Sequence, residues 1–107
     1  FRHLPIVEEG ELVGIVSDRD LRAFLAPSML ELEKPSDVQK KLAQPVSSVM
    51  NADVVSVTPE TELTEVIEMM IDQKVGAVPV VRPGSQELVG IVSYIDVLRA
   101  AQDLFED

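Results

Sequence analysis

Short runs of consecutive apolar residues alternate along the chain with segments in which apolar residues recur every three or four positions. The runs Leu12–Val16 and Leu88–Val92 are typical of strands buried on both faces. Each follows a β-branched run after a proline and a turn that contains Gly10 or Gly84. The pattern therefore predicts one β-hairpin near each end of the chain.

Helical spacing predicts a helix after each hairpin and another ahead of the second one. The helix ahead of it is expected from about Thr61 to Gln73, preceded by a strand at Val54–Val57. Its apolar face is expected to consist of Leu63, Val66, Ile67, Met70 and Ile71. The helix after the second hairpin carries most of a 3.6-residue stripe, which is apolar except at Gln102: Ile95, Leu98, Ala101, Gln102 and Phe105. After the first hairpin we expect a shorter helix that stops near Pro27, and a short helix from Ser36 in the polar connector.

The two hairpin segments are copies of one repeat. Residues 3–10 align with residues 77–84, Glu11–Ser17 is identical to Glu87–Ser93, and Asp20 aligns with Asp96. The second copy is predicted as β-α-β-β-α, the first only as β-β-α. We therefore expect residues 1–27 to be the C-terminal part of a first repeat, 28–45 a connector, and 46–107 a complete second repeat, so that the chain begins inside repeat one.

Charge and composition exclude several classes of function. The chain holds 9 Lys and Arg against 19 Asp and Glu, and its net charge of −10 argues against nucleic acid as a partner. No apolar run approaches the roughly 20 residues that cross a bilayer, so direct membrane insertion is not expected. Cysteine is absent, which favours a reducing, cytoplasmic location. One histidine, no cysteine and no glycine-rich phosphate loop argue against an enzyme.

Several motifs occur in a recognisable order. They are Pro45–Met50, Val54–Pro59, Gly76–Val81, and the twice-used Leu-Val-Gly-Ile-Val-Ser followed three residues after its serine by Asp. In this order they resemble a tandem pair of CBS (cystathionine-β-synthase-like) domains, also called a Bateman module. The resemblance covers nearly the whole chain and rests on the combination, because no single motif is specific.

The resemblance implies an α+β fold in which two β-α-β-β-α repeats pack about a pseudo-two-fold axis. Small sheets would face each other with helices outside and two clefts between the repeats. It also implies a regulatory module that binds an adenosine-containing ligand, such as AMP, ADP, ATP or S-adenosylmethionine. Such modules commonly form homodimers and regulate an enzyme, a transporter or a channel.

The pairs Ser17 and Asp20, and Ser93 and Asp96, stand where a strand becomes a helix. A serine followed three residues later by a carboxylate forms a capping box, which stabilises a helix by about 0.5–2 kcal/mol. Alternatively, the helix N-terminus and the hydroxyl favour a phosphate, and the carboxylate can bind the two hydroxyls of a ribose. The resemblance assigns these positions the second role.

The two copies differ around these pairs. Arg19 carries a guanidinium suited to phosphate, and Ile95 stands at its equivalent position. Arg2 and His3 precede the first hairpin where some nucleotide-binding CBS repeats carry basic phosphate ligands, and the second copy has Gly76-Ala77 there. The alternatives are a surface imidazole at His3 and a frayed terminus at Arg2.

For the adenine, the resemblance points to apolar residues of the second repeat: Val55, Val57, Pro79 and Val80. Ordinary core packing is the alternative for each of them. At the level of the whole module, two hypotheses stay open: a ligand-sensing regulatory pair, and a structural dimerisation module whose clefts no longer bind a ligand. The loss of basic residues from the second copy supports the latter.

Overall fold

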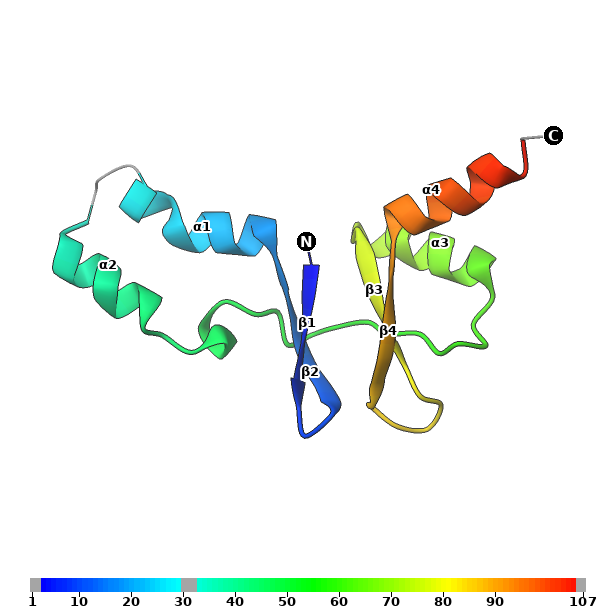
Figure 1. The fold of residues 1–107 in the computed structure, drawn as a ribbon, viewed down its shortest axis with the longest axis horizontal. Coiled ribbons are helices and arrows are strands. Elements are labelled where there is room, and N and C mark those ends of the chain that lie inside the picture. Colours follow the sequence, from blue (N-terminus) through cyan, green and yellow to red (C-terminus); the bar gives the residue numbers. More distant parts are fainter. Residues whose placement is uncertain (1–2, 30–32, 106–107) are drawn as a thin grey trace. The chain divides into compact units, whose positions relative to one another are not determined.

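The computed structural model describes residues 3–29 and 33–105 and divides the chain into two compact units (Figure 1). The first unit holds the residues up to Ile6 together with Val13–Val54. The second holds Val7–Leu12 and the residues from Val55 onward. Small antiparallel sheets and helices build both units, which confirms the predicted α+β class.

The first half of the chain contains β1 (His3–Glu8), β2 (Glu11–Ser17), α1 (Asp18–Met29), α2 (Pro35–Leu42) and the 3₁₀ turn η1 (Val46–Ser48). The first predicted hairpin is confirmed. Its turn consists of Glu9 and Gly10, both at positive φ (53° and 82°), as in the two-residue turns that match the twist of antiparallel strands. The helix predicted from Ser36 is also confirmed and starts one residue earlier, with Pro35 at its first position.

Helix α1 continues past Pro27. It ends at Met29, two residues later, so the predicted end near Pro27 is confirmed. The prediction that it is the shorter of the two equivalent helices is wrong, because α1 has 12 residues and α4 has 10. Proline lacks only its own N–H, so the helix loses the bond to the carbonyl of Ala23 while the fixed φ of the ring still suits a helix. Near its C-terminal end, α1 tolerates this loss.

Glycine lets another segment of the first unit cross β2 closely. Ile15 and Asn51 exchange two backbone hydrogen bonds, from Ile15 N–H to Asn51 O (3.0 Å) and from Asn51 N–H to Ile15 O (2.8 Å). A Cβ on the neighbouring Gly14 would lie 2.6 Å from Met50 Sδ and 3.2 Å from Asn51 O. The position therefore has no room for a side chain.

The second unit contains α3 (Leu63–Gln73), β3 (Ala77–Val81), β4 (Leu88–Ser93) and α4 (Tyr94–Asp103). Strands β3 and β4 pair antiparallel, which confirms the second predicted hairpin. Val66 and Met70 of α3 pack with Val57 and Val78 into the core of this unit. These helix positions belong to the predicted apolar face of α3, whereas Leu63 and Ile71 at its margins are exposed.

The strand predicted at Val54–Val57 is reduced to a single bridge, so that prediction is wrong. Val57 alone pairs, in parallel with Val80, through Val57 N–H to Pro79 O (3.0 Å) and Val81 N–H to Val57 O (2.7 Å). The next bond of a parallel ladder would need a donor at residue 79, facing the carbonyl of Val55. Proline has no N–H, and the ladder stops there.

Burial on both faces holds for β3 but not for β4. In β3, Ala77, Val78, Pro79 and Val81 are buried. In β4, the side chains of Val89 and Ile91 are 45% and 39% exposed. The continuous apolar run correctly indicated a strand, yet the prediction of two buried faces is wrong for β4 in this chain.

The apolar stripe predicted for α4 is not the side that meets the core. Ile95 is 39% exposed and Leu98 59%, whereas Val97 packs against the core cluster. The stripe predicted from the spacing and the face that meets the core are therefore different sides of α4. The stripe leaves an apolar helix face uncovered in the second unit.

Candidate functional site

Both serine–aspartate pairs form the predicted capping box. In the first copy Asp20 N–H donates to Ser17 Oγ (3.0 Å) and Ser17 N–H donates to Asp20 Oδ2 (3.1 Å). In the second copy the corresponding distances are 3.2 Å for Asp96 N–H to Ser93 Oγ and 2.9 Å for Ser93 N–H to Asp96 Oδ2. The strand ends and the helix begins in the same way in both copies.

Each cap uses only one oxygen of its carboxylate. The contacts to the serine reach Oδ2 in Asp20 and in Asp96, where Ser93 Oγ–H also donates to it at 3.0 Å. Within the described part of the chain, no hydrogen bond engages Oδ1 of either residue. Capping therefore leaves each carboxylate an oxygen able to accept a hydroxyl.

The first turn of α4 offers fewer amides to an anion than the sequence suggested. Tyr94 N–H donates to the carbonyl of Gly76 (2.9 Å), and Asp96 N–H is taken by the cap. In the part of the chain that the structure describes, the N–H of Ile95 is the one amide of this first turn without an acceptor. The sequence did not predict the hydrogen bond to Gly76, because any residue type can accept through its backbone carbonyl.

The pKa of Asp96 lies below the ordinary value because Ser93 donates to its carboxylate, first from the backbone N–H and second from the hydroxyl, with a smaller contribution from Arg99. A lowered pKa means that folding favours the ionised form. The stabilisation is thus fully present above the unfolded pKa of about 3.9 and is lost as the pH falls through the folded value.

We expect Ser93→Ala to raise the pKa of Asp96 part of the way toward the ordinary value, because the hydroxyl donor to its carboxylate is lost while the backbone N–H donor stays. An NMR titration of the Asp96 side-chain carboxyl carbon measures this. Ser48→Ala, at a serine of the first unit, is the matched control and should leave the titration unchanged. An unaltered Asp96 titration in Ser93→Ala would contradict the assignment.

The predicted phosphate ligands are placed unequally. Arg19 is exposed in the first turn of α1, beside the Ser17–Asp20 cap, and Asp18 of the same turn pairs with Arg22 at 3.6 Å. Ile95 at the equivalent place in α4 is apolar. His3 is half-buried at the start of β1, and Arg2 lies outside the described residues. Between the serine and the aspartate of the cap, the first copy therefore carries a basic side chain and the second an apolar one.

The four residues predicted for adenine differ in accessibility. Val57 is 5% exposed and Pro79 belongs to the fully buried side chains, so both contribute to the core of the second unit. Val55 and Val80 are half-buried and retain accessible surface. Of this set, Val55 and Val80 are the side chains that a ligand can touch without rearrangement of the core.

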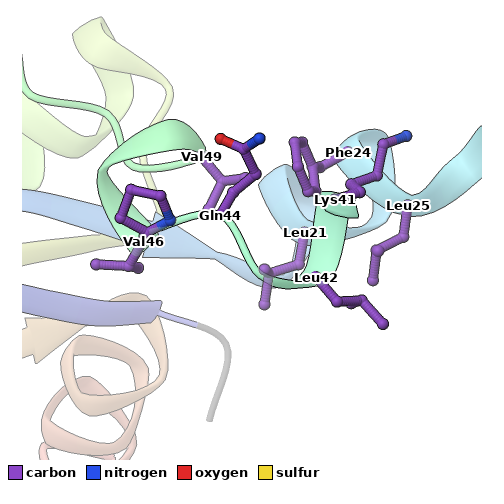
Figure 2. A pocket seen from close by; sticks show the side chains of 9 residues that line it. Leu21, Phe24, Leu25, Lys41, Leu42, Gln44, Val46 and Val49 are labelled. Carbon is purple, nitrogen blue, oxygen red and sulfur yellow. The ribbon is translucent and has the colours of Figure 1, made fainter. Parts of the chain in front are cut away.

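An apolar pocket of about 200 Å³ lies in the first unit (Figure 2). Two of its lining residues contact each other, because Lys41 Nζ lies 5.1 Å from the centre of the Phe24 ring. Lys41 also forms an ion pair with Glu33 at 2.8 Å. The lining comes from α1, α2 and the segment around η1: Leu21, Phe24, Leu25, Lys41, Leu42, Gln44, Pro45, Val46 and Val49. No residue predicted for ligand binding lines it.

Among residues 3–29 and 33–105, no group of three or more His, Cys, Asp or Glu side chains is arranged to hold a metal ion. None of the helices in this part of the chain combines the length and apolar character needed to cross a bilayer.

Comparison with known proteins adds a family and several relatives. The CBS domain family matches residues 1–27 and 46–103. An uncharacterized 33.4 kDa protein of Thermofilum pendens is 39% identical over 97 residues, which are 86% of this chain and 32% of that protein. The chain thus spans about a third of this curated relative's length.

Two similar crystal structures contain adenosine compounds. CBSX2, solved in complex with AMP, has a TM-score of 0.78 at 27% identity. The match covers 99% of this chain and 75% of the CBSX2 chain. The CBS domain pair of protein MJ0100, solved with 5′-methylthioadenosine and S-adenosyl-L-methionine, has a TM-score of 0.77 at 28% identity, with 97% of this chain and 73% of that one covered.

Proposed function

The chain belongs to the CBS domain family, and from this we propose that it is a regulatory module that binds an adenosine-containing ligand and modulates a partner. The observation that carries the proposal is the duplicated cap, in which Asp20 and Asp96 each keep one oxygen for a ribose hydroxyl. The adenosine compounds bound by CBSX2 and by the MJ0100 domain pair support this ligand class.

We further propose that residues 1–27 and 46–107 form the two repeats, joined by the connector 28–45. The role proposed is binding rather than catalysis, and the ligand is AMP, ADP, ATP or a compound of the S-adenosylmethionine type. The regulated partner is an enzyme, a transporter or a channel, in a separate chain or in a further domain.

The place of each side chain in the structure suggests which part of the ligand it would contact. Asp20 and Asp96 accept the ribose hydroxyls, Ser17 and Ser93 lie beside them, and Val55 and Val80 offer apolar surface to the adenine. Arg19, with His3 and Arg2, binds phosphate in the first copy. Because Ile95 replaces the guanidinium, the second copy attracts phosphate less strongly.

A thermal-shift panel of AMP, ADP, ATP, S-adenosylmethionine and NAD tests the proposal. A ligand at ten times its Kd stabilises the folded state by about 1.4 kcal/mol, which raises the Tm of a domain of this size by several degrees. Inosine and inorganic phosphate serve as controls for the base and for the charge. If none of the adenosine compounds raises the Tm, the ligand-sensing function is wrong.

Asp20→Ala and Asp96→Ala identify the copy that is used. We expect the variant of the occupied copy to weaken ligand binding by about tenfold, because a ribose loses its charged acceptor. Asp103→Ala, at an exposed carboxylate in the last turn of α4, is the matched control and should leave the affinity unchanged. Affinity unchanged from the wild type in both aspartate variants would refute the ribose assignment.

A structural dimerisation module is the second candidate. It is favoured by the uncovered apolar side chains of α3 and α4, where Ile71 is 68% exposed and Leu98 59%. A homodimer is part of both candidates. Sedimentation equilibrium that shows a dimer, together with a flat thermal-shift panel, would select this one.

A further inference from the structure

The tip of the first hairpin pairs with the start of β4 inside the second unit. Leu12 N–H donates to Gln86 O (2.7 Å) and Leu88 N–H donates to Gly10 O (3.2 Å). Between these two bonds Glu11 and Glu87 stand directly opposite each other in an antiparallel bridge. They are equivalent residues of the two copies, and this type of pair brings side chains closest together.

Two more charged residues extend this pair into a row. The two-residue turn at Glu9 and Gly10 places Glu8 opposite Glu11. On the other side Arg82 N–H donates to Glu87 O (2.9 Å), and Arg82 Nε lies 2.6 Å from Glu87 Oε2. Side chains of directly opposed residues share a face.

The row thus consists of Glu8, Glu11, Glu87 and Arg82, all exposed to solvent. It contains two like-charge contacts between neighbours and one ion pair. Glu9 adds a fifth charge in the turn itself, outside the row. The hydrogen bond and charge of Glu87 raise the pKa of Arg82, whose guanidinium is charged in any case.

We propose that this row makes the backbone pairing between the hairpin tip and β4 depend on ionic strength, with Arg82 holding the pairing closed at low salt. Directly opposed like charges destabilise a strand pair, and exposed charges are screened by salt. The contact ion pair of Arg82 and Glu87 is screened less than the repulsion that Glu11 meets from both sides. Added salt therefore strengthens the pairing.

Hydrogen exchange of the Leu12 and Leu88 amides, followed by NMR, reports this pairing directly. In low salt, where the Debye length is about 30 Å, we expect Glu11→Gln to raise their protection about two- to fivefold. Arg82→Gln should lower it by a similar factor. In 1 M NaCl, where the Debye length is about 3 Å, wild-type protection should approach that of Glu11→Gln.

Glu9→Gln is the matched control, because it removes the same charge two residues away but outside the row. The amide of Val81, bonded to Val57 O at 2.7 Å in the same unit, is the internal reference for global stability. The proposal is overturned if Glu9→Gln and Glu11→Gln change the protection equally. It is also overturned if wild-type protection relative to Val81 does not rise with salt.

Discussion

Met70→Ala is expected to lower the free energy of unfolding of the second unit by about 2–5 kcal/mol. Met70 is 9% exposed and packs against Val57, Val66 and Val78, so its truncation removes contacts from the centre of a small core. The surrounding valines are short and stiff, and they cannot close the cavity. Urea denaturation followed by circular dichroism measures the loss as a lower midpoint.

Ile71→Ala is the matched control on the same helix. Its side chain is 68% exposed, and alanine is the better helix former, so we expect a change within about 0.5 kcal/mol. If the two variants lose equal stability, the assignment of the core face of α3 is wrong.

Gly14→Ala is expected to cost about 1–3 kcal/mol, because the added Cβ would meet Met50 Sδ at 2.6 Å and Asn51 O at 3.2 Å. The methionine side chain can yield, but the backbone carbonyl is fixed by its bond from Ile15 N–H. Thermal denaturation and the exchange rate of the Ile15 amide should both report the strain.

The second copy contains its own control at the equivalent position. A Cβ on Gly90 meets only Val80 Cβ, at 4.0 Å, which is ordinary contact. Gly90→Ala should therefore be neutral or stabilise by up to about 1 kcal/mol, as alanine costs less chain entropy than glycine. If both variants are destabilised by a similar amount, close packing of Met50 and Asn51 is not the reason that glycine is needed at position 14.

The duplicated heptapeptide allowed both hairpins and both caps to be predicted from the sequence. Strand, turn and cap are local features, and Gly10, Ser17 and Ser93 carry them in their residue types. The apolar spacing of α3 likewise identified Val66 and Met70 as core residues. Such predictions hold because neighbours in sequence decide them.

Features that depend on contact with a segment distant in sequence could not be predicted from the sequence. The strand predicted at Val54–Val57 does not form, because Pro79, distant in sequence, has no N–H that could donate to the carbonyl of Val55. The carbonyl of Gly76 takes an amide of α4 without any mark in the sequence. The uncovered stripe of α4 shows the same limit, since spacing defines an apolar face but not what lies against it.

The caps at Ser17 and Ser93 serve folding independently of ligand binding. Because each cap stabilises its helix whether or not a ligand is present, selection for a folded protein retains both residues in a copy that has stopped binding. A repeat can thus abandon its ligand with no trace at the serine and the aspartate. A difference in ligand binding between the copies is instead to be sought at Arg19 and Ile95, where the two aligned segments differ.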